Sequence, residues 1–253
     1  MAHIHKTEEI SPPLPNSPPG NRVKGKLLFF LRKVADLQVA SVLQHLQPWL
    51  AELSGEVLEV GCGAQPYRHL IPKSCHYHGL DWQGAEQLFH YKTDDTTYYD
   101  GKLFPFKNHT FDYLFHTEVL EHVYNMTLFL KECCRVLKPN GGLLCTIPFQ
   151  ARYHYIPFDF WRLTPAALQR IFAETGFQQI QIIPRGNDLT VAAYKVIGVL
   201  FRWGQGSWWN KFMAFCCLPI GIIALITGHL AMRFNWGSSD DCLGYTVTAH
   251  TKD

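Results

Sequence analysis

The residues best suited to chemistry lie in the stretch Glu56-Val57-Leu58-Glu59-Val60-Gly61-Cys62-Gly63, where an apolar run ends in two closely spaced glycines. Glycine has no Cβ atom, so a ligand can lie against the backbone at positions 61 and 63. Both positions can also adopt the dihedral angles that a tight turn requires. A strand that runs into such a turn and then into a helix is typical of a nucleotide-like cofactor site. The pattern therefore predicts a cofactor at this turn.

An acidic residue at the expected distance supports this interpretation. Asp81 lies 20 positions after Gly61 (81 − 61), close to the place of the ribose carboxylate in dinucleotide-binding folds. Its carboxylate can accept both ribose hydroxyls, and the indole of Trp82 can cover an adenine face, although it can equally pack against a helix. Pro66 stands where a dinucleotide fingerprint has its third glycine, which argues against a nicotinamide or flavin dehydrogenase. A different adenosyl cofactor fits better.

These residues need strands that end at a common edge of a sheet. Apolar runs predict strands at 56–60, 76–81, 111–116, 142–148, 177–183 and 243–250. Helical patterns lie between them, at 65–71, 124–138 and 164–175, and one or two covering helices span 27–53 with a possible break at Pro48. The alternation predicts a mostly parallel α/β sheet with helices on both faces. Ligands bind beyond the carboxyl ends of such strands, where four groups fall: the 59–63 turn, Asp81 with Trp82, Asp100, and the segment 116–122.

Four segments in the usual order resemble the motifs of class I S-adenosylmethionine-dependent methyltransferases. The segment VLEVGCGAQPY of this chain resembles the family's first motif, and YHGLD resembles the second. The segment FPFKNHTFDYLFHTEVLEHV resembles the family's region around the fourth strand. The segment RVLKPNGGLLCTIPF resembles the helix, turn and fifth strand that follow it. The resemblance covers roughly residues 55 to 183 and implies a type 11-like methyltransferase domain. Its fold is a Rossmann-like, seven-stranded, mostly parallel sheet with an antiparallel last strand.

The resemblance also implies roles for single residues around S-adenosylmethionine. Its methionine end is expected to lie against Glu59, Gly61, Cys62 and Gly63, and its ribose to be held by Asp81. Trp82 would flank the adenine, and Asp100 or a neighbour would face the adenine amine. His116 would lie beside the cofactor, just after the fourth strand. Two residues depart from the family pattern. Gln65 replaces the last glycine of the first motif, and Asn140 replaces a glycine of the turn before the fifth strand. Asparagine tolerates the left-handed conformation, so that turn is expected to form.

The loop after the fifth strand offers candidates for acid–base chemistry. The segment HYIPFDFWRLT further resembles a subgroup associated with surface-glycan and small-molecule methylation. A hydroxyl acceptor requires a base, and His154 is preferred over Asp159 because histidine titrates near neutrality. The alternatives are that His154 only shapes the loop and that Asp159 and Arg162 pair as architectural supports. His122 is interpreted as a structural or capping group.

Composition excludes several other classes of protein. The net charge of the 253-residue chain is +2 and no basic run occurs, so nucleic acid is not an expected partner. None of the eight cysteines forms a zinc-binding spacing, and no metal site is expected. Residues 1–22 are proline-rich and predict a disordered tail, without the apolar core of a secretory signal. A cytoplasmic enzyme is expected, and its oligomeric state stays open.

An apolar insert at 189–236 divides the predicted catalytic domain into residues 23–188 and 237–253. Phe212 to Met232 carries no formally charged residue, and four tryptophans flank this stretch at 203, 208, 209 and 236. Length and flanks indicate membrane contact. Because both ends of the insert must return to one sheet, a helical hairpin in one leaflet at the inner face of the membrane is preferred over a full span. A buried lid or a dimer surface is the alternative.

The sequence therefore predicts a methyltransferase that acts on a hydroxyl, less readily an amine or carboxyl, of a small-molecule, glycan or lipid-linked acceptor. The rival interpretation is a non-catalytic module with a methyltransferase fold that anchors or regulates a membrane-bound partner.

Overall fold

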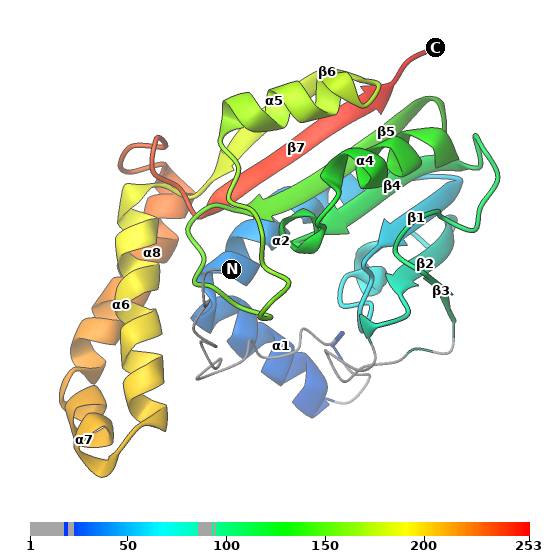
Figure 1. Ribbon diagram of the computed structural model, residues 1–253. Helices are drawn as coiled ribbons and strands as arrows, with labels where there is room; N and C mark the ends of the chain where they lie inside the picture. The colour runs from blue at the N-terminus through cyan, green and yellow to red at the C-terminus, as the bar shows by residue number, and fades with distance from the viewer. Residues whose placement is uncertain (1–17, 20–22, 86–92, 94) are drawn as a thin grey trace, which may run out of the picture.

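The protein is described from a computed structural model, which covers residues 18–19, 23–85, 93 and 95–253. The predicted tail at 1–22 lies outside the described residues apart from positions 18 and 19. Figure 1 shows one twisted sheet with helices against both of its faces and a pair of long helices that projects from one end.

The sheet has seven strands in the order β3-β2-β1-β4-β5-β7-β6. The strands are β1 Glu56–Val60, β2 His76–Trp82, β3 Thr96–Tyr99, β4 Phe111–Thr117, β5 Leu137–Pro148, β6 Phe177–Arg185 and β7 Gly244–Thr251. Strands β1 to β5 pair in parallel, and β7 runs antiparallel to both β5 and β6. This confirms the predicted fold class. The short strand β3 was not predicted.

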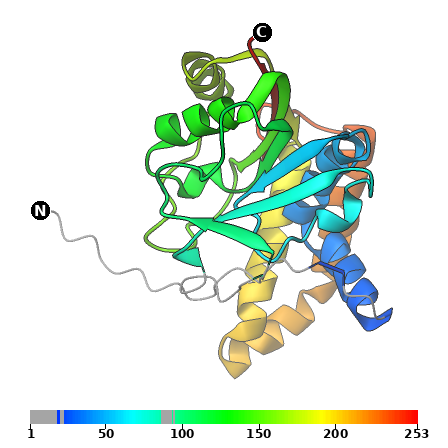
Figure 2. The ribbon, with the colours of Figure 1, turned by 90° about the vertical axis from the view of Figure 1, so that its right-hand side faces the viewer.

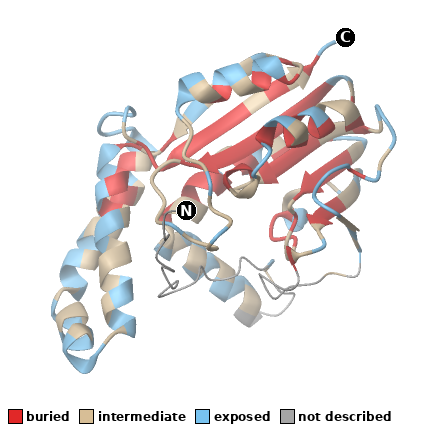
Figure 3. Ribbon diagram, viewed as in Figure 1, coloured by how far each residue is buried: buried red, intermediate tan, exposed pale blue. Residues whose placement is uncertain are grey.

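Helices cover the two faces unequally. The helices next to the sheet are α2 Leu37–Ala51, α4 Met126–Val136 and α5 Pro165–Glu174, with short 3-10 turns η1 Arg68–Leu70 and η2 Leu120–His122. Helix α1 Val23–Ala35 precedes α2 and contacts it. Side chains of α4 and α5 form the larger core with β1, β4, β5 and β7, whereas α2 forms a second core on the opposite face. Figure 3 shows the central strands almost wholly buried between these layers.

The break between the first two helices lies at Asp36 and not at the predicted Pro48. The Asp36 carboxylate accepts hydrogen bonds from Gln38 N at 3.0 Å and Val39 N at 3.3 Å, which caps the start of α2. Pro48 sits inside α2, where the neighbouring Leu46 and Leu50 are fully buried. Their burial outweighs the cost of a proline in the last turns of the helix.

The insert folds into three helices, α6 Asp188–Gln205, α7 Trp208–Cys216 and α8 Leu218–Phe234. Both α6 and α8 run side by side away from the sheet, as Figures 1 and 2 show, and α7 forms the turn at the far end. Within the described residues no single helix is long and apolar enough to cross a membrane. The pair α7 and α8 meets that test by length and composition when taken together, with a bend of 57° between them.

Candidate functional site

A cavity of about 1180 Å³ lies beyond the carboxyl ends of β1 and β4. Its inner wall consists of the turn after β1 and of Thr117, Glu118 and Val119 at the end of β4. The outer walls come from α1, from the first turns of α2 and from α6, and His122 and His154 also line the cavity. The cavity is therefore placed where open parallel sheets bind their ligands, and it is large enough for a nucleoside cofactor and an acceptor.

The turn after β1 has the backbone conformation that the glycine pattern predicts. Gly61 and Gly63 have φ angles of 67° and 53°, and Gly61 N donates to Leu80 O at 2.8 Å. A Cβ atom at Gly61 would come within 2.5 Å of Val119 Cγ2, so only glycine fits this cradle. Gln65 also adopts a positive φ of 55° in place of the family's last glycine. Its side-chain amide donates to Thr96 Oγ1 at 3.0 Å, so the substitution keeps the shape of the turn.

Asp81 ties the end of β2 to this turn. Its carboxylate accepts hydrogen bonds from Gly63 N and Trp82 N, each at 2.8 Å. The side chain is 6% exposed, and burial raises the pKa of Asp81 to about 6 against the effect of those two hydrogen bonds. A carboxylate oxygen can accept more than one hydrogen bond, so Asp81 keeps capacity for ribose hydroxyls. The buried carboxylate and the glycine cradle fit an adenosyl cofactor.

Two more predicted residues lie at the same turn. Glu59 lines the cavity and accepts a hydrogen bond from the Tyr77 hydroxyl at 2.5 Å. Burial raises the pKa of Glu59 to about 8. Cys62 also lines the cavity, and burial raises the pKa of its thiol, which makes the thiol unreactive. The structure thus brings Glu59, Gly61, Cys62 and Gly63 together with Asp81.

Among the described residues, Asp81 and the remaining predicted cofactor residues do not belong to the lining of the cavity. The Trp82 indole packs against Phe158, with 5.9 Å between the ring centroids, and Asp100 is exposed and accepts a hydrogen bond from Lys102 N. His116 lies within β4 rather than just after it, because the strand extends to Thr117. It is fully buried against Phe129 of α4, and burial lowers its pKa to about 3. The roles of Trp82, Asp100 and His116 toward the cofactor remain predictions.

The two catalytic candidates form a hydrogen-bonded chain in the loop after β5. His154 Nδ1 lies 2.9 Å from Arg152 O and 3.0 Å from Asp159 Oδ2. Asp159 in turn accepts two hydrogen bonds from Arg162, at 2.6 and 2.7 Å. Burial raises the pKa of Asp159, but the hydrogen bonds from His154 and Arg162 outweigh it and hold the pKa below its usual range. Asp159 is therefore a fixed anion that orients His154, and only His154 of the two lines the cavity.

Two neighbours of His154 belong to the segment 116–122, which the sequence placed at the binding edge without a chemical role for either of them. The ring centroids of His122 and His154 are 4.9 Å apart, and His122 also lines the cavity. Burial, and then the nearby His154, lower the pKa of His122 to about 4. Glu121 is fully buried beside them, and burial and the Glu118 carboxylate raise its pKa well above the ordinary value. The available signal was the position of Glu118, Glu121 and His122 directly after β4.

Comparisons with known proteins agree with this geometry. Residues 58–145 match the family model described as a methyltransferase domain. The human mitochondrial ubiquinone biosynthesis O-methyltransferase is 36% identical over 122 residues, which span 40% of this chain and 29% of that protein. A probable S-adenosylmethionine-dependent methyltransferase of Mycolicibacterium smegmatis is 27% identical over 133 residues, 49% of this chain and 52% of that protein. The chain thus matches about half or less of the length of these curated relatives.

The fold resembles those of solved structures. An S-adenosylmethionine-dependent methyltransferase from Archaeoglobus fulgidus superposes with a TM-score of 0.52 and 14% identity, over 88% of this chain and 99% of that one. Residues 58–145 therefore belong to a methyltransferase domain, which is an enzyme domain. Its cofactor is S-adenosylmethionine.

Proposed function

We propose that this protein transfers a methyl group from S-adenosylmethionine to a hydroxyl of a small molecule that carries an aromatic ring and an apolar part. The observation that carries the proposal is that one cavity holds both the glycine turn after β1 and His154. Cofactor and acceptor can therefore meet within the same space. The human relative named above is an O-methyltransferase of ubiquinone biosynthesis, which supports a ring hydroxyl as the acceptor.

The walls of the cavity favour an acceptor with an apolar part. Leu28 and Leu31 of α1 and Ile197 and Phe201 of α6 line it, and Leu28, Leu31 and Phe201 are each at least half exposed. Exposed apolar side chains at the edge of a cavity gain free energy when an apolar ligand covers them. A glycan offers little apolar surface to these walls. The acceptor class that the walls favour is a hydroxylated ring with a hydrocarbon chain.

His154 is suited to remove the proton of the hydroxyl. The partners of its Nδ1 atom are an Arg152 carbonyl and the Asp159 carboxylate, which are both acceptors, so Nδ1 carries the ring proton. The Nε2 lone pair is then available to the acceptor, and the Asp159 carboxylate stabilises the imidazolium that forms. When bound, S-adenosylmethionine supplies an electrophilic methyl group on a positively charged sulfur. The acceptor oxygen gains the bond to this methyl as the sulfur–carbon bond breaks.

A panel of acceptors tests this proposal. Methyl transfer from isotopically labelled S-adenosylmethionine is measured to a catechol with a hydrocarbon chain, to its amine and carboxyl analogues, and to a sugar. We expect the label on the catechol oxygen. Labelling of the sugar alone would contradict the acceptor class, and the absence of S-adenosylmethionine binding in titration calorimetry would contradict the enzyme itself.

We also propose that the α7–α8 face rests on a lipid bilayer, as a peripheral contact at the inner face of the membrane. Its exposed large apolar side chains include Trp208, Trp209, Phe212, Phe215, Leu218, Ile220, Ile222, Ile223, Ile226, Phe234 and Trp236. Lys211 and Arg233 adjoin this face and suit anionic headgroups. In α1, Leu27, Leu28, Phe30 and Leu31 are exposed as well, and α1 and α7 project to the same side of the molecule in Figures 1 and 2.

Flotation with anionic lipid vesicles measures this contact. We expect the wild-type chain to float with the vesicles and the triple variant Trp208→Ser, Phe215→Ser, Ile223→Ser to lose at least about 100-fold in partitioning. Burial of each such side chain is worth roughly 1.5–3 kcal/mol. Leu103→Ser combined with Tyr124→Ser removes exposed apolar groups elsewhere and is the matched control. The membrane contact is contradicted if the triple variant floats as well as the wild type, or if the wild type stays in the soluble fraction. A change in the oligomeric state of the triple variant would indicate a dimer surface instead.

A further inference from the structure

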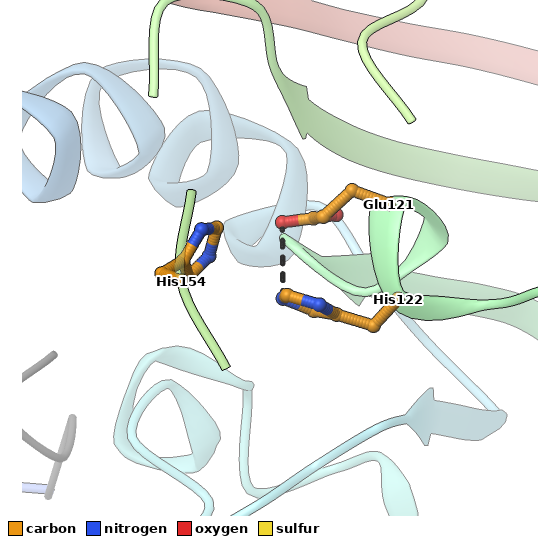
Figure 4. Close-up of side chains that lie close together, drawn as sticks. All are labelled: Glu121, His122 and His154. Carbon is orange, nitrogen blue, oxygen red and sulfur yellow. Dashed lines mark ion pairs between the residues drawn. The ribbon is translucent and has the colours of Figure 1, made fainter. Parts of the chain in front are cut away.

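Three side chains of types that bind metal ions meet beside the cavity, and two of them, His122 and His154, line it. Glu121 and His122 belong to η2, which follows β4, and His154 belongs to the loop after β5. One potential ligand atom from each side chain lies within 4.8 Å of the other two. Figure 4 shows the Glu121 carboxylate pointing toward the region between the two imidazole rings. The cluster is built from two segments that only the fold brings together.

Glu121 lacks the partners that a buried carboxylate requires. Its side chain is 0% exposed, and within the described residues neither of its oxygens accepts a hydrogen bond. His122 Nε2 lies 3.6 Å from Oε1 of Glu121. A buried, unpaired carboxylate is costly, so this position calls for a cation or a proton. A cation that satisfies Glu121 can at the same time reach a nitrogen of each histidine, because the three ligand atoms lie within 4.8 Å of one another.

The two histidines are oriented as metal ligands usually are. His122 Nδ1 lies 2.8 Å from Phe158 O, and His154 Nδ1 is shared between Arg152 O and Asp159. Because these partners are acceptors, Nδ1 of each ring carries the proton and Nε2 carries the lone pair. A ligating histidine almost always donates its other N–H to a carbonyl or a carboxylate in this way. Arg162 fixes the orientation of Asp159 by donating a hydrogen bond to each of its carboxylate oxygens.

We propose that Glu121, His122 and His154 bind a divalent first-row transition-metal cation, with Zn²⁺ as the reference ion. Two neutral imidazoles and one carboxylate are the ligand set of three-ligand zinc sites that keep an open position. Mg²⁺ prefers oxygen ligands and fits this set less well. Both histidines line the cavity, so the open position faces the acceptor. Glu118 is adjacent, but its Oε1 is held by Arg185 Nη2 at 2.7 Å.

The site refines the role proposed for His154. A hydroxyl oxygen at the open position loses its proton more readily, because the cation favours the oxyanion. In the cation-bound form Nε2 of His154 is a ligand, and the proton of the hydroxyl leaves to water. The sequence predicted no metal site, because its cysteine and histidine spacings show none and the three ligands become neighbours only through the loop after β5.

Metal binding to the full chain, without cofactor or acceptor, tests this inference separately from the proposed function. The protein is stripped with a chelator and titrated with Zn²⁺ against a chromophoric competitor. We expect one Zn²⁺ per chain, and His122→Gln and Glu121→Gln to weaken binding more than about 100-fold. Asp159→Asn, which acts through His154, is expected to weaken it about 10–100-fold. His76→Gln, in the surface pair of His76 with Glu56, is the control that keeps full affinity.

Two further readouts keep the test decisive. Calorimetry with S-adenosylmethionine shows whether each variant is folded, because the glycine turn and Asp81 lie outside the cluster. The absorption spectrum of Co²⁺ bound to the wild type reports a four-coordinate nitrogen and oxygen site without any substitution. The proposal is overturned if the wild type takes up no Zn²⁺, or if His122→Gln binds Zn²⁺ as tightly as His76→Gln does. In either case protonation of Glu121 would explain how the buried carboxyl group is tolerated.

Discussion

Replacing His154 by alanine is expected to lower the rate of methyl transfer by about 10²–10⁴-fold, the range for loss of a positioned acid–base group. The affinity for S-adenosylmethionine is expected to stay unchanged, because His154 bonds within its own loop, to Arg152 O, whereas Asp81 bonds to the glycine turn at Gly63 N. The variant removes the Nε2 atom but leaves the Asp159–Arg162 pair in the loop. Single-turnover transfer to the catechol acceptor, with calorimetry for the cofactor, measures both quantities.

A second histidine provides the control. His109 lies just before β4, at the opposite end of that strand from the cavity, with Nδ1 3.1 Å from Leu137 O, and His109→Ala is expected to leave the rate as it is. Repeating the assay after chelation separates the two roles of His154. If His154 acts as a metal ligand, chelation slows the wild type and has little further effect on His154→Ala. Full turnover by His154→Ala with intact cofactor binding removes His154 from the mechanism.

Replacing Asp81 by alanine is expected to weaken S-adenosylmethionine binding about 100-fold or more. The change removes the predicted ribose acceptor and frees the amides of Gly63 and Trp82, which both donate to this carboxylate. Hydrogen bonds to a charged group contribute roughly 1.5–3 kcal/mol each, and about 1.4 kcal/mol corresponds to a factor of ten. Titration calorimetry measures the loss, and unchanged affinity would falsify the assignment of Asp81.

The pH dependence of cofactor binding gives an independent check on Asp81. Burial raises the pKa of this carboxyl to about 6, so the acceptor form prevails above that pH and the protonated form below it. Affinity for S-adenosylmethionine is therefore expected to fall as the pH is lowered through about 6. Asp81→Asn keeps the size of the side chain but does not titrate, so its profile is expected to stay flat across that range. A parallel fall in both proteins would assign the pH effect to another group.

The sequence contains most of the information on the sheet, because strands buried between two layers of helices leave uninterrupted apolar runs. The glycines at 61 and 63 and the acid at 81 were found for the same reason: their roles depend on local backbone and on the end of a strand. β3 was missed because Thr-Thr-Tyr-Tyr is short and only half buried. The helix predicted at 65–71 shrinks to the 3-10 turn η1, since Gln65 adopts a left-handed conformation just before Pro66.

Side-chain direction in β4 was harder to predict. Phe115 packs in the core with α2, so alternation along the strand turns His116 toward α4 and away from the cavity. The strand also extends one residue further than predicted, to Thr117. Glu121 and His122 lie within a single 3-10 turn and resemble a helix cap in the sequence. Their proximity to His154 depends on the path of a loop that follows another strand, which no local pattern encodes.

The two ends of the helical insert lie side by side, which bears on the order of folding. Asp188 N donates to Ser238 O at 3.0 Å, and Ser238 N donates to the Asp188 side chain at 3.1 Å, so the insert leaves and rejoins the sheet at one point. Without the helices, pairing of β6 with β7 would require closure of a long flexible loop, with its entropy cost. Packing of α8 against α6 brings the two ends together beforehand and shortens the effective loop. β7 follows both of its sheet neighbours in the chain, so we expect it to enter the slot between β5 and β6 late in assembly.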